Sequence, residues 1–386
     1  MLHRDTIFAS ILKPISRRRF DRHAERHQGD RYAKSLSTWC QFSALAYGQL
    51  SNASSLRAVT AGWNAHAQHH YHLGASEICR STLADANAKR PARIFADMFT
   101  DLSFEADRQL RRDAGPVIRL IDSSPIPVSK LCDWATSNGR TSGLKLHVVY
   151  DPVADHPRVA DISPANVNDV TIGRETAMEP GAIYVFDKAY SDYRWWADMH
   201  GANCTFVTRP KSNVKFKVTA VSQGPQRPGD GFTVIAAEIV EHETRAHVRL
   251  TMPMRRITVR RHEDKKIVEL ITNDMHSTPD EIANLYKMRW QIELLFRWIK
   301  QHLKVRTFLG RSENAIRIQV LVAMIVYLLL RLAAKTASVK MLPLRFAELV
   351  GACLFERKTI THIDKPPERV YRRTYAHPDQ MKMTYA

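Results

Sequence analysis

The chain has 386 residues, 44% of them hydrophobic and 25% charged, a balance that excludes a disordered chain and fits a globular protein of two or three domains. Lys and Arg number 57 against 39 acidic residues, and the formal net charge of +18 favours a polyanionic partner. Ribosomal proteins, nucleases, regulators and membrane-surface proteins share such a charge, so the charge by itself does not choose among them.

The cysteines and the apolar segments restrict the cellular setting. The five cysteines lie far apart, without paired spacing for zinc or redox chemistry, which indicates reduced thiols. The apolar stretch from Ile7 to Leu12 is too short for a secretory signal. The longest apolar run, Val320 to Leu330, has eleven residues, fewer than the roughly 20 that cross a bilayer. We therefore expect a cytoplasmic protein without a membrane partner, in which this run is a buried helix.

Residues 1–110 are expected to form a helical domain, because β-branched runs are few and helix-start residues recur. Two short helices joined by a turn at Gly74 suggest a DNA reader that resembles a helix-turn-helix. Its second helix, residues 80–90, would present four polar side chains to DNA: Arg80, Ser81, Asn87 and Lys89. Plain packing of the two helices is the alternative. A nearby histidine group predicts a solvated loop rather than a metal site, since Cys and acidic ligands are absent beside it: His66, His69, His70 and His72.

From Pro116 the sequence changes to short apolar or alternating runs bounded by Pro, Gly, Asn and Asp, which predicts strands. The expected strands are 117–121, 143–150, 158–162, 182–186 and 204–208. Helices should begin near Asn168 and Ser191. This order predicts an α/β fold with a mixed sheet flanked by helices, and it is also the order of the ribonuclease H-like fold. Residues 111–210 would be the first part of that domain.

Residues 211–275 alternate in a different way and predict a β-rich insertion, with strands at 232–239, 247–252, 257–261 and 267–272. Four arginines on these strands would either track DNA phosphates or form a solvated face of the sheet: Arg255, Arg256, Arg260 and Arg261. Residues 276–340 would be the second part of the interrupted domain. The tail, residues 341–386, has no role beyond contacts with DNA or a second protomer.

Two carboxylates end apolar strands. Asp122 closes the run VIRLID, and Asp187 closes the run IYVFD. A buried acidic side chain is costly unless it pairs with a cation. Taken singly, each aspartate could also be a helix cap or a salt-bridge partner.

A long helix with a clearly marked start carries a third carboxylate. Thr278 and Glu281 form a capping box around Pro279, so we expect one helix from there to about His302. On a regular helix, four of its polar residues would share an arc of roughly 60°: Tyr286, Arg289, Glu293 and Lys300.

The adjoining apolar stripe would pack against the sheet and turn Glu293 toward the two aspartates. Three ionised carboxylates at one place require cations. Hard oxygen ligands suit Mg²⁺ or Mn²⁺ rather than zinc.

With these residues the sequence resembles the DDE transposases of bacterial insertion sequences, specifically the insertion-sequence-four family. That family carries Tyr, two residues, Arg, three residues, Glu, six residues and Lys, as in the polar stripe of residues 286–300. Its motif of Asp, one residue, Gly or Ala and an aromatic is matched by Asp187, Ala189 and Tyr190, and its first Asp by Asp122. The N-terminal segments SLRAV and STLADANAKR are also similar to the family.

The resemblance implies cut-and-paste transposition by two-metal phosphoryl transfer. Asp122, Asp187 and Glu293 would be catalytic and would hold Mg²⁺, with Mn²⁺ as a substitute. Tyr286, Arg289 and Lys300 would grip DNA phosphates near the cut. The implied partners are double-stranded DNA, as terminal inverted repeats and as target, and a second copy of the chain in a synaptic homodimer. The cellular place would be the bacterial nucleoid.

Family members excise their element through DNA hairpins, with a flipped base stacked on an aromatic residue of the insertion. This sequence departs from the family there, since no Trp lies between Trp196 and Trp290. The stacking role would fall to Phe216, Phe232 or Trp298.

Two other functions use the same residues. A catalytically silent copy would act as a DNA-binding regulator or inhibitor of transposition, and the intact carboxylates argue against it. A ribonuclease H-like nuclease or resolvase would cut without joining strands, and the helical N-terminal region and β-rich insertion favour the transposase. Near the first strands, Lys130, Lys145 and His147 would either touch DNA or metal-bound water, or lie on the surface.

Overall fold

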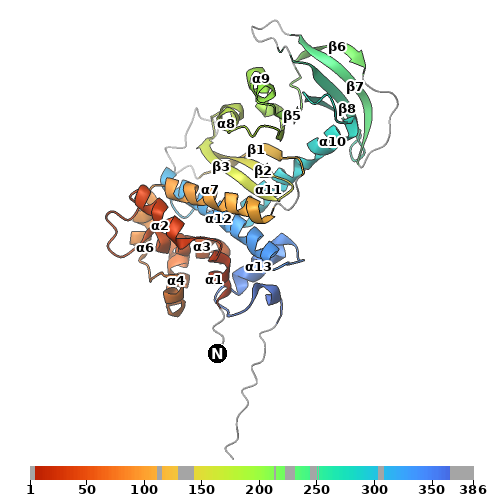
Figure 1. Cartoon of the computed structure of the whole chain (residues 1–386). Coiled ribbons are helices and arrows are strands. Elements are labelled where there is room, and N and C mark those ends of the chain that lie inside the picture. Colours follow the sequence, from red (N-terminus) through yellow and green to blue (C-terminus); the bar gives the residue numbers. More distant parts are fainter. Residues whose placement is uncertain are drawn as a thin grey trace, which may run out of the picture.

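The computed structural model describes residues 5–110, 115–128, 143–212, 214–221, 231–243, 250, 252–302 and 308–365. Cys132, Lys130, most of the predicted strand 247–252 and the tail beyond residue 365 lie outside this description. The described chain is a mixed α/β fold, in which one nine-stranded sheet is flanked by helices (Figure 1).

The described part of the first 110 residues is helical. Its elements are α1 (Ile7–Leu12), α2 (Arg17–Arg26), α3 (Thr38–Leu50), α4 (Leu56–Asn64), η1 (Ala67–His69), α5 (His70–Leu73), α6 (Arg80–Lys89) and α7 (Arg93–Leu110). Hydroxyl side chains cap the first four helices by accepting a backbone N–H: Thr6, Ser16, Ser37 and Ser55. Every residue of α3 is buried, because this helix packs against α2, α4, α12 (Glu313–Thr336) and α13 (Pro343–Ala352).

The sheet has the strand order β3-β2-β1-β4-β5-β9-β8-β7-β6. The strands are β1 (Ile118–Pro127), β2 (Gly143–Asp151), β3 (His156–Pro164), β4 (Ile183–Phe186), β5 (Thr205–Thr208), β6 (Lys215–Val221), β7 (Phe232–Glu243), β8 (Met254–Arg261) and β9 (Ile267–Thr272). β4 pairs parallel with β1 and with β5, and the other neighbours are antiparallel. The five strands predicted between residues 117 and 208 are confirmed.

The β-rich segment after β5 continues this same sheet. β9 joins β5 through the pairs Val207↔Thr272 and Thr208↔Ile271. β8, β7 and β6 then follow in order, and they project as an arm from the rest of the molecule (Figure 1). The arm is therefore bonded to the central strands through the hydrogen-bond ladder.

Alternating side chains bury both faces of the central strands. On one face, residues of β1, β4 and β5 pack with Trp195 and Trp196 of α9 (Tyr193–Gly201). α8 (Asp169–Glu175) and η3 (Lys188–Tyr190) lie beside this cluster. On the other face, Leu120, Val185 and Val207 belong to a larger cluster that includes α7, α11 (Trp290–His302) and α12. The sheet thus separates two apolar cores.

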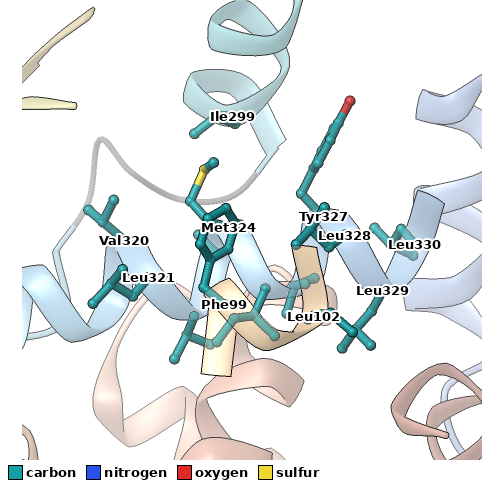
Figure 2. Packing of buried hydrophobic residues seen from close by; sticks show 14 of the residues in the cluster. Phe99, Leu102, Ile299, Val320, Leu321, Met324, Tyr327, Leu328, Leu329 and Leu330 are labelled. Carbon is teal, nitrogen blue, oxygen red and sulfur yellow. The ribbon is translucent and has the colours of Figure 1, made fainter. Parts of the chain in front are cut away.

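Helix α12 forms the centre of the larger core. Figure 2 shows Met324 of α12 between Ile299 of α11 and Phe99 of α7. By length and composition α12 could cross a membrane, but 89% of its most apolar window is buried inside the fold, as in the core helix of a globular domain. The prediction of a buried helix at residues 320–330 is confirmed. Because α7 also contacts β3, the N-terminal helices share this core with the sheet.

Candidate active site

Asp122 and Asp187 lie on neighbouring strands of the central sheet. Asp187 directly follows β4, as expected, whereas Asp122 lies in the middle of β1, which continues to Pro127, so the expectation that Asp122 ends a strand is wrong. The two strands are parallel and Ile121 pairs with Phe186, so the next residue of each strand is one of the two aspartates. Side chains alternate along a strand, and Asp122 therefore lies on the face that contacts α11.

The helical segment that brings Glu293 to this face starts as predicted. Thr278 caps α10 (Pro279–Met288), and Glu281 completes the capping box. Pro279 occupies the first turn. This helix start is confirmed.

One continuous helix to His302 is a wrong prediction, because the structure divides the segment at Arg289. The N–H of Arg289 donates to the carbonyl of Tyr286 at 3.1 Å, and the N–H of Ile292 donates to the carbonyl of Arg289 at 3.2 Å. These three-residue spacings are those of a single 3₁₀ turn, and the backbone of Arg289 stays in the right-handed helical region. Arg289 therefore marks the boundary between α10 and α11 and still pairs with Glu293 four residues later.

The guanidinium of Arg289 bridges two of the three carboxylates. Its Nη1 lies 3.2 Å from Oδ2 of Asp122, and its Nη2 donates to Oε1 of Glu293. The side chains of Arg289 and Asp122 are each 18% exposed, and that of Glu293 is 33% exposed. Charge-assisted hydrogen bonds at such low exposure hold the middle of β1 and the start of α11 together.

Burial, together with the negative charges of Asp187 and Glu293, raises the pKa of Asp122 to about 6. The Ser123 N–H, 2.8 Å from Oδ1, and the charge of Arg289 act in the opposite direction. Both other carboxylates are thus close enough to act on Asp122, and its protonated form is favoured.

The donor set of this site fits a hard divalent cation. Carboxylate oxygens are the ligands that Mg²⁺ and Mn²⁺ prefer, and a cation would favour the ionised form of Asp122, which burial and the charges of Asp187 and Glu293 disfavour. Within the described residues, no three His, Cys, Asp or Glu side chains are gathered tightly enough to enclose a metal ion. Arg289 lies between Asp122 and Glu293 in this arrangement, so a bound cation would require the guanidinium to shift.

An open cleft of about 330 Å³ lies at the bridged carboxylates. Asp122 and Glu293 line it, together with the predicted phosphate ligand Lys300. Arg297, one helical turn before Lys300, is exposed and lines the same cleft. Sequence reasoning missed Arg297 because it stands outside the recognised spacing of polar residues on this helix.

Tyr286 lies on the Asp187 side of the site. Its ring is 5.7 Å from the guanidinium carbon of Arg289, and burial raises the pKa of its phenol. The charges of Arg209 and Asp187 also act on this phenol. Arg209 directly follows β5, so the carboxyl ends of β4 and β5 supply Asp187 and Arg209, and the middle of the neighbouring β1 supplies Asp122. Sequence reasoning missed Arg209 as a site residue. Its position directly after a short apolar strand was the signal that could have indicated it.

Lys145 and His147 lie in the interior, on the opposite side of β1 from Arg289. Lys145 is 3.0 Å from Asp169, and the Ser123 hydroxyl donates to Asp169 at 2.6 Å. His147 is 5% exposed, bonds to Ser163 at 2.8 Å, and has a pKa lowered by burial. These groups contact β1 on the face of the sheet that carries α8, and they do not line the cleft at Asp122.

The predicted DNA-reading residues of α6 fall into two groups. Arg80, Ser81 and Lys89 are exposed. Asn87 is buried, and its side-chain oxygen accepts from the amide of Gln41 at 2.7 Å. Asn87 is therefore a packing residue, and its assignment as a DNA reader is wrong.

The four arginines of β8 have separate environments. Arg255 is 5% exposed and donates to the backbone carbonyls of Asp274 and Ser277 ahead of α10, so it holds that turn. Arg256 pairs with Glu238 at 2.6 Å. Arg261 pairs with Asp264 at 2.5 Å, and Arg260 is exposed. Only Arg260 and Arg261, at the exposed end of β8, are therefore placed to contact DNA phosphates among these four arginines.

Three of the four histidines are packed rather than solvated. His70 stacks on Trp63 with ring centres 4.2 Å apart, and His66 and His69 both stack on Phe355. The expected solvated loop is wrong for these three, because His70 packs within the N-terminal helices and the other two rings contact the segment after α13, whereas His72 is exposed.

The three aromatics proposed for base stacking also differ in position. Phe232 is 5% exposed. Phe216 is half-buried beside His242, with ring centres 6.0 Å apart. Trp298 packs edge to face on Tyr327 at 4.9 Å.

Comparison with known proteins gives two family matches. The family described as Transposase DDE domain matches residues 113–329, and a domain of unknown function, DUF4372, matches residues 3–76. The chain is 52% identical over 305 residues to a protein named as transposase y4zB from Sinorhizobium fredii, covering 78% of this chain and 85% of the relative. It is 28% identical over 258 residues to a protein named as a transposase for insertion sequence element IS5377 from Geobacillus stearothermophilus, covering 65% and 66%.

A third relative and one solved structure are also similar. A protein named as a transposase for insertion sequence element IS4SA from Synechocystis is 27% identical over 266 residues, covering 65% of this chain and 71% of the relative. A piggyBac transposase synaptic complex with hairpin DNA matches with a TM-score of 0.46 at 11% identity, covering 94% of this chain and 81% of that one.

Proposed function

Because this chain belongs to the Transposase DDE domain family, and is a transposase, we propose that it cleaves the terminal inverted repeats of an insertion sequence and joins the freed ends to target DNA. The reaction would be a metal-dependent, cut-and-paste phosphoryl transfer. We assign the catalytic roles to Asp122, Asp187 and Glu293.

The bridge from Arg289 to Asp122 and Glu293 carries this assignment. It joins residues that are 167 and 4 positions away in the sequence, and it thereby brings strand β1 and helix α11 to one cleft. Parallel pairing of β1 and β4 supplies Asp187 at the same end of the sheet. Arg289 offsets part of the charge of two of these carboxylates, and divalent cations would offset the charge of all three.

When bound, two Mg²⁺ or Mn²⁺ ions would activate an attacking oxygen and stabilise the leaving oxygen of the DNA backbone. The three carboxylates would hold those ions. Lys300 lines the cleft as a compact cation for a phosphate. The Tyr286 hydroxyl and the Nε of Arg289 are fully buried, so either would donate to a DNA phosphate only after neighbouring side chains move.

The finer family assignment is the insertion-sequence-four family, with the Tyr, Arg, Glu and Lys spacing of residues 286–300 as its support. The fold we propose is ribonuclease H-like. An antiparallel run of β1, β2 and β3 followed by parallel β4 and β5 supports it.

The proposed domains are a helical DNA-binding domain at 1–110, a catalytic domain at 111–210 and 276–340 with β-rich residues 211–275 inserted, and the tail at 341–386. Double-stranded DNA would be the partner, and two protomers would join two element ends in the bacterial nucleoid. Exposure of Arg80, Ser81 and Lys89 is compatible with DNA contact from α6.

Strand transfer of a labelled, precut inverted-repeat DNA tests the proposal. With Mg²⁺ or Mn²⁺ the parent should transfer the end, whereas Glu293→Ala and Asp187→Asn should bind DNA and transfer none. DNA binding by the parent without metal-dependent cleavage would instead support the silent regulator of transposition.

A further inference from the structure

Helix α2 presents a row of arginines that the proposed catalytic chemistry does not use. At about 100° per residue, four arginines fall within an arc of about 100° on one side of the helix: Arg18, Arg19, Arg22 and Arg26. All four are exposed. Arg18 and Arg26 are eight residues apart, which corresponds to roughly 12 Å along the helix axis.

The opposite side of α2 is fixed to the fold. Phe20 and Ala24 are buried in the larger core, and the ring of Phe20 packs edge to face on Trp39 at 5.1 Å. Side-chain bonds to α7 secure one flank, with His23 at 2.9 Å from Asp101 and His27 at 2.7 Å from Asp97. The arginine row is therefore presented by a helix that cannot readily rotate.

The charges of this row are largely unneutralised within the described residues. Arg18, Arg19 and Arg22 have no side-chain ion pair or hydrogen bond there, and the closest acid of Arg26 is Asp97 at 3.8 Å. Arg26 is also 73% exposed. Such a density of free guanidinium groups is costly in self-repulsion and is typical of a surface that receives a polyanion.

The segment after α2 also carries exposed basic and aromatic side chains. Arg31, Tyr32 and Lys34 follow α2, and all three are exposed, Tyr32 to 85%. The guanidinium of Arg31 lies over the Tyr32 ring at 5.4 Å. Side chains of these types contact phosphate and sugar in protein–DNA complexes.

The partner that fits this surface is duplex DNA and not a membrane. Membrane-surface helices insert an apolar face below the lipid head groups, and the apolar face of α2 is already buried in the core. A duplex carries about seven phosphate charges over roughly 12 Å, which is ample for three or four arginines.

We infer that the α2 arginine row docks the phosphate backbone of duplex DNA at a site separate from the carboxylate cleft, without reading sequence. The inference rests on the proposed function for the presence of DNA. Figure 1 shows α2 beside α7, on the side of the molecule away from the β6–β8 arm. DNA bound at α2 would be held through α7 in a fixed relation to the sheet, because α7 packs on both α2 and β3.

The test compares the salt dependence of DNA binding by the full chain and by the triple variant Arg18→Gln, Arg22→Gln and Arg26→Gln. Each lost phosphate contact removes ~0.9 from the slope of log affinity against log salt concentration, so the triple variant should lose about 3. Affinities for a random-sequence duplex and for an inverted-repeat duplex should fall by the same factor. The triple variant with Lys in place of each Arg should keep the slope of the parent.

The matched control removes three exposed cations at the other end of the chain: Lys335→Gln, Lys340→Gln and Arg345→Gln. An unchanged slope in the arginine variant, or an equal loss in the control, would overturn the inference. Lost binding to anionic phosphatidylserine vesicles with unchanged DNA binding would also overturn it. At low salt and saturating DNA the arginine variant should transfer strands like the parent, so a parent that transfers none would count against the proposed function and not against the docking surface.

Discussion

Nη1 of Arg289 lies 3.2 Å from Oδ2 of Asp122, and the same guanidinium donates through Nη2 to Glu293. This contact places a cation between two carboxylates that would otherwise face each other at low exposure. It has consequences for stability that are separate from the reaction.

Arg289→Met should destabilise the fold in the absence of divalent cations. Removing one partner from a half-buried ion pair leaves the other charge uncompensated, at a cost of about 2–4 kcal/mol. The loss should be larger at pH 8 than at pH 5, because Asp122 is protonated over part of that range. Urea unfolding in EDTA measures it, with exposed Arg297→Met as the control. Equal losses at both pH values would contradict the bridge.

Asp122 should impose a pH dependence on stability. Its pKa in the folded chain is about 6, above the ordinary value of 3.8, so the folded state binds the proton more tightly. The resulting stabilisation is fully present below pH 3.8 and is lost as the pH rises through 6. In EDTA, the unfolding free energy of the parent relative to Asp122→Asn should fall by about 2 kcal/mol from pH 4 to pH 7. A flat difference between the two proteins would refute this origin of the shift.

Divalent cations should change that pH dependence. A cation favours the ionised carboxylates, so Mn²⁺ should raise the melting temperature of the parent most at pH 7 and least at pH 4. Asp122→Asn should show a smaller increase. The melting temperature should be measured with Mn²⁺, with Ca²⁺ and with NaCl at equal ionic strength. An equal rise in melting temperature with NaCl would indicate charge screening and not specific cation binding.

The start of α10 should depend on one hydroxyl. The Thr278 side chain accepts from the N–H of Glu281 at 3.3 Å, and the Glu281 carboxylate accepts from the N–H of Thr278 at 2.7 Å. Thr278→Ala should cost about 1 kcal/mol, and Thr278→Ser should cost little. Thermal unfolding of both variants distinguishes the two explanations. A lost cap lowers the melting temperature of Thr278→Ala alone, whereas a general effect of substitution would lower the melting temperatures of both variants.

The buried pair behind β1 should behave as a unit. Lys145 and Asp169 are 3.0 Å apart at 16% and 19% exposure. Lys145→Met should cost about 3 kcal/mol because Asp169 loses its cation, and adding Asp169→Asn should restore part of that loss. Additive losses in the double variant would show that the two charges do not interact.

Local signals in the sequence were enough to predict much of the fold. The strands of residues 117–208 and the cap at Thr278 depend on neighbouring residues, and the structure has them. The sequence also indicated that Asp122 and Asp187 belong to apolar strands, but it wrongly ended the first strand at Asp122. The adjacency of the two aspartates through the pair Ile121↔Phe186 required the sheet order, which no local pattern contains.

The wrong predictions depend on contacts between distant residues. The 3.6-residue period of apolar residues continues across Arg289, so the sequence predicts one helix there. In the structure the two helices meet at Arg289, and the Arg289 side chain bonds to Asp122 of β1. Arg255 is charged and sits in an exposed-looking basic run, yet it satisfies two backbone carbonyls inside the fold. Asn87 was expected at the surface because its side chain is polar, but it is buried and bonds to Gln41. Burial of a polar side chain depends on a partner that the local sequence does not show.

Binding of Mn²⁺ to the full chain with inverted-repeat DNA tests the central claim most directly. Calorimetric titration at pH 7.5 should show specific Mn²⁺ binding by the parent that is lost in Asp122→Asn, Asp187→Asn and Glu293→Gln, with DNA binding retained in each. Glu175→Gln, on α8, should bind Mn²⁺ like the parent. Undiminished Mn²⁺ binding by all three carboxylate variants would contradict the assignment of these residues as the metal ligands.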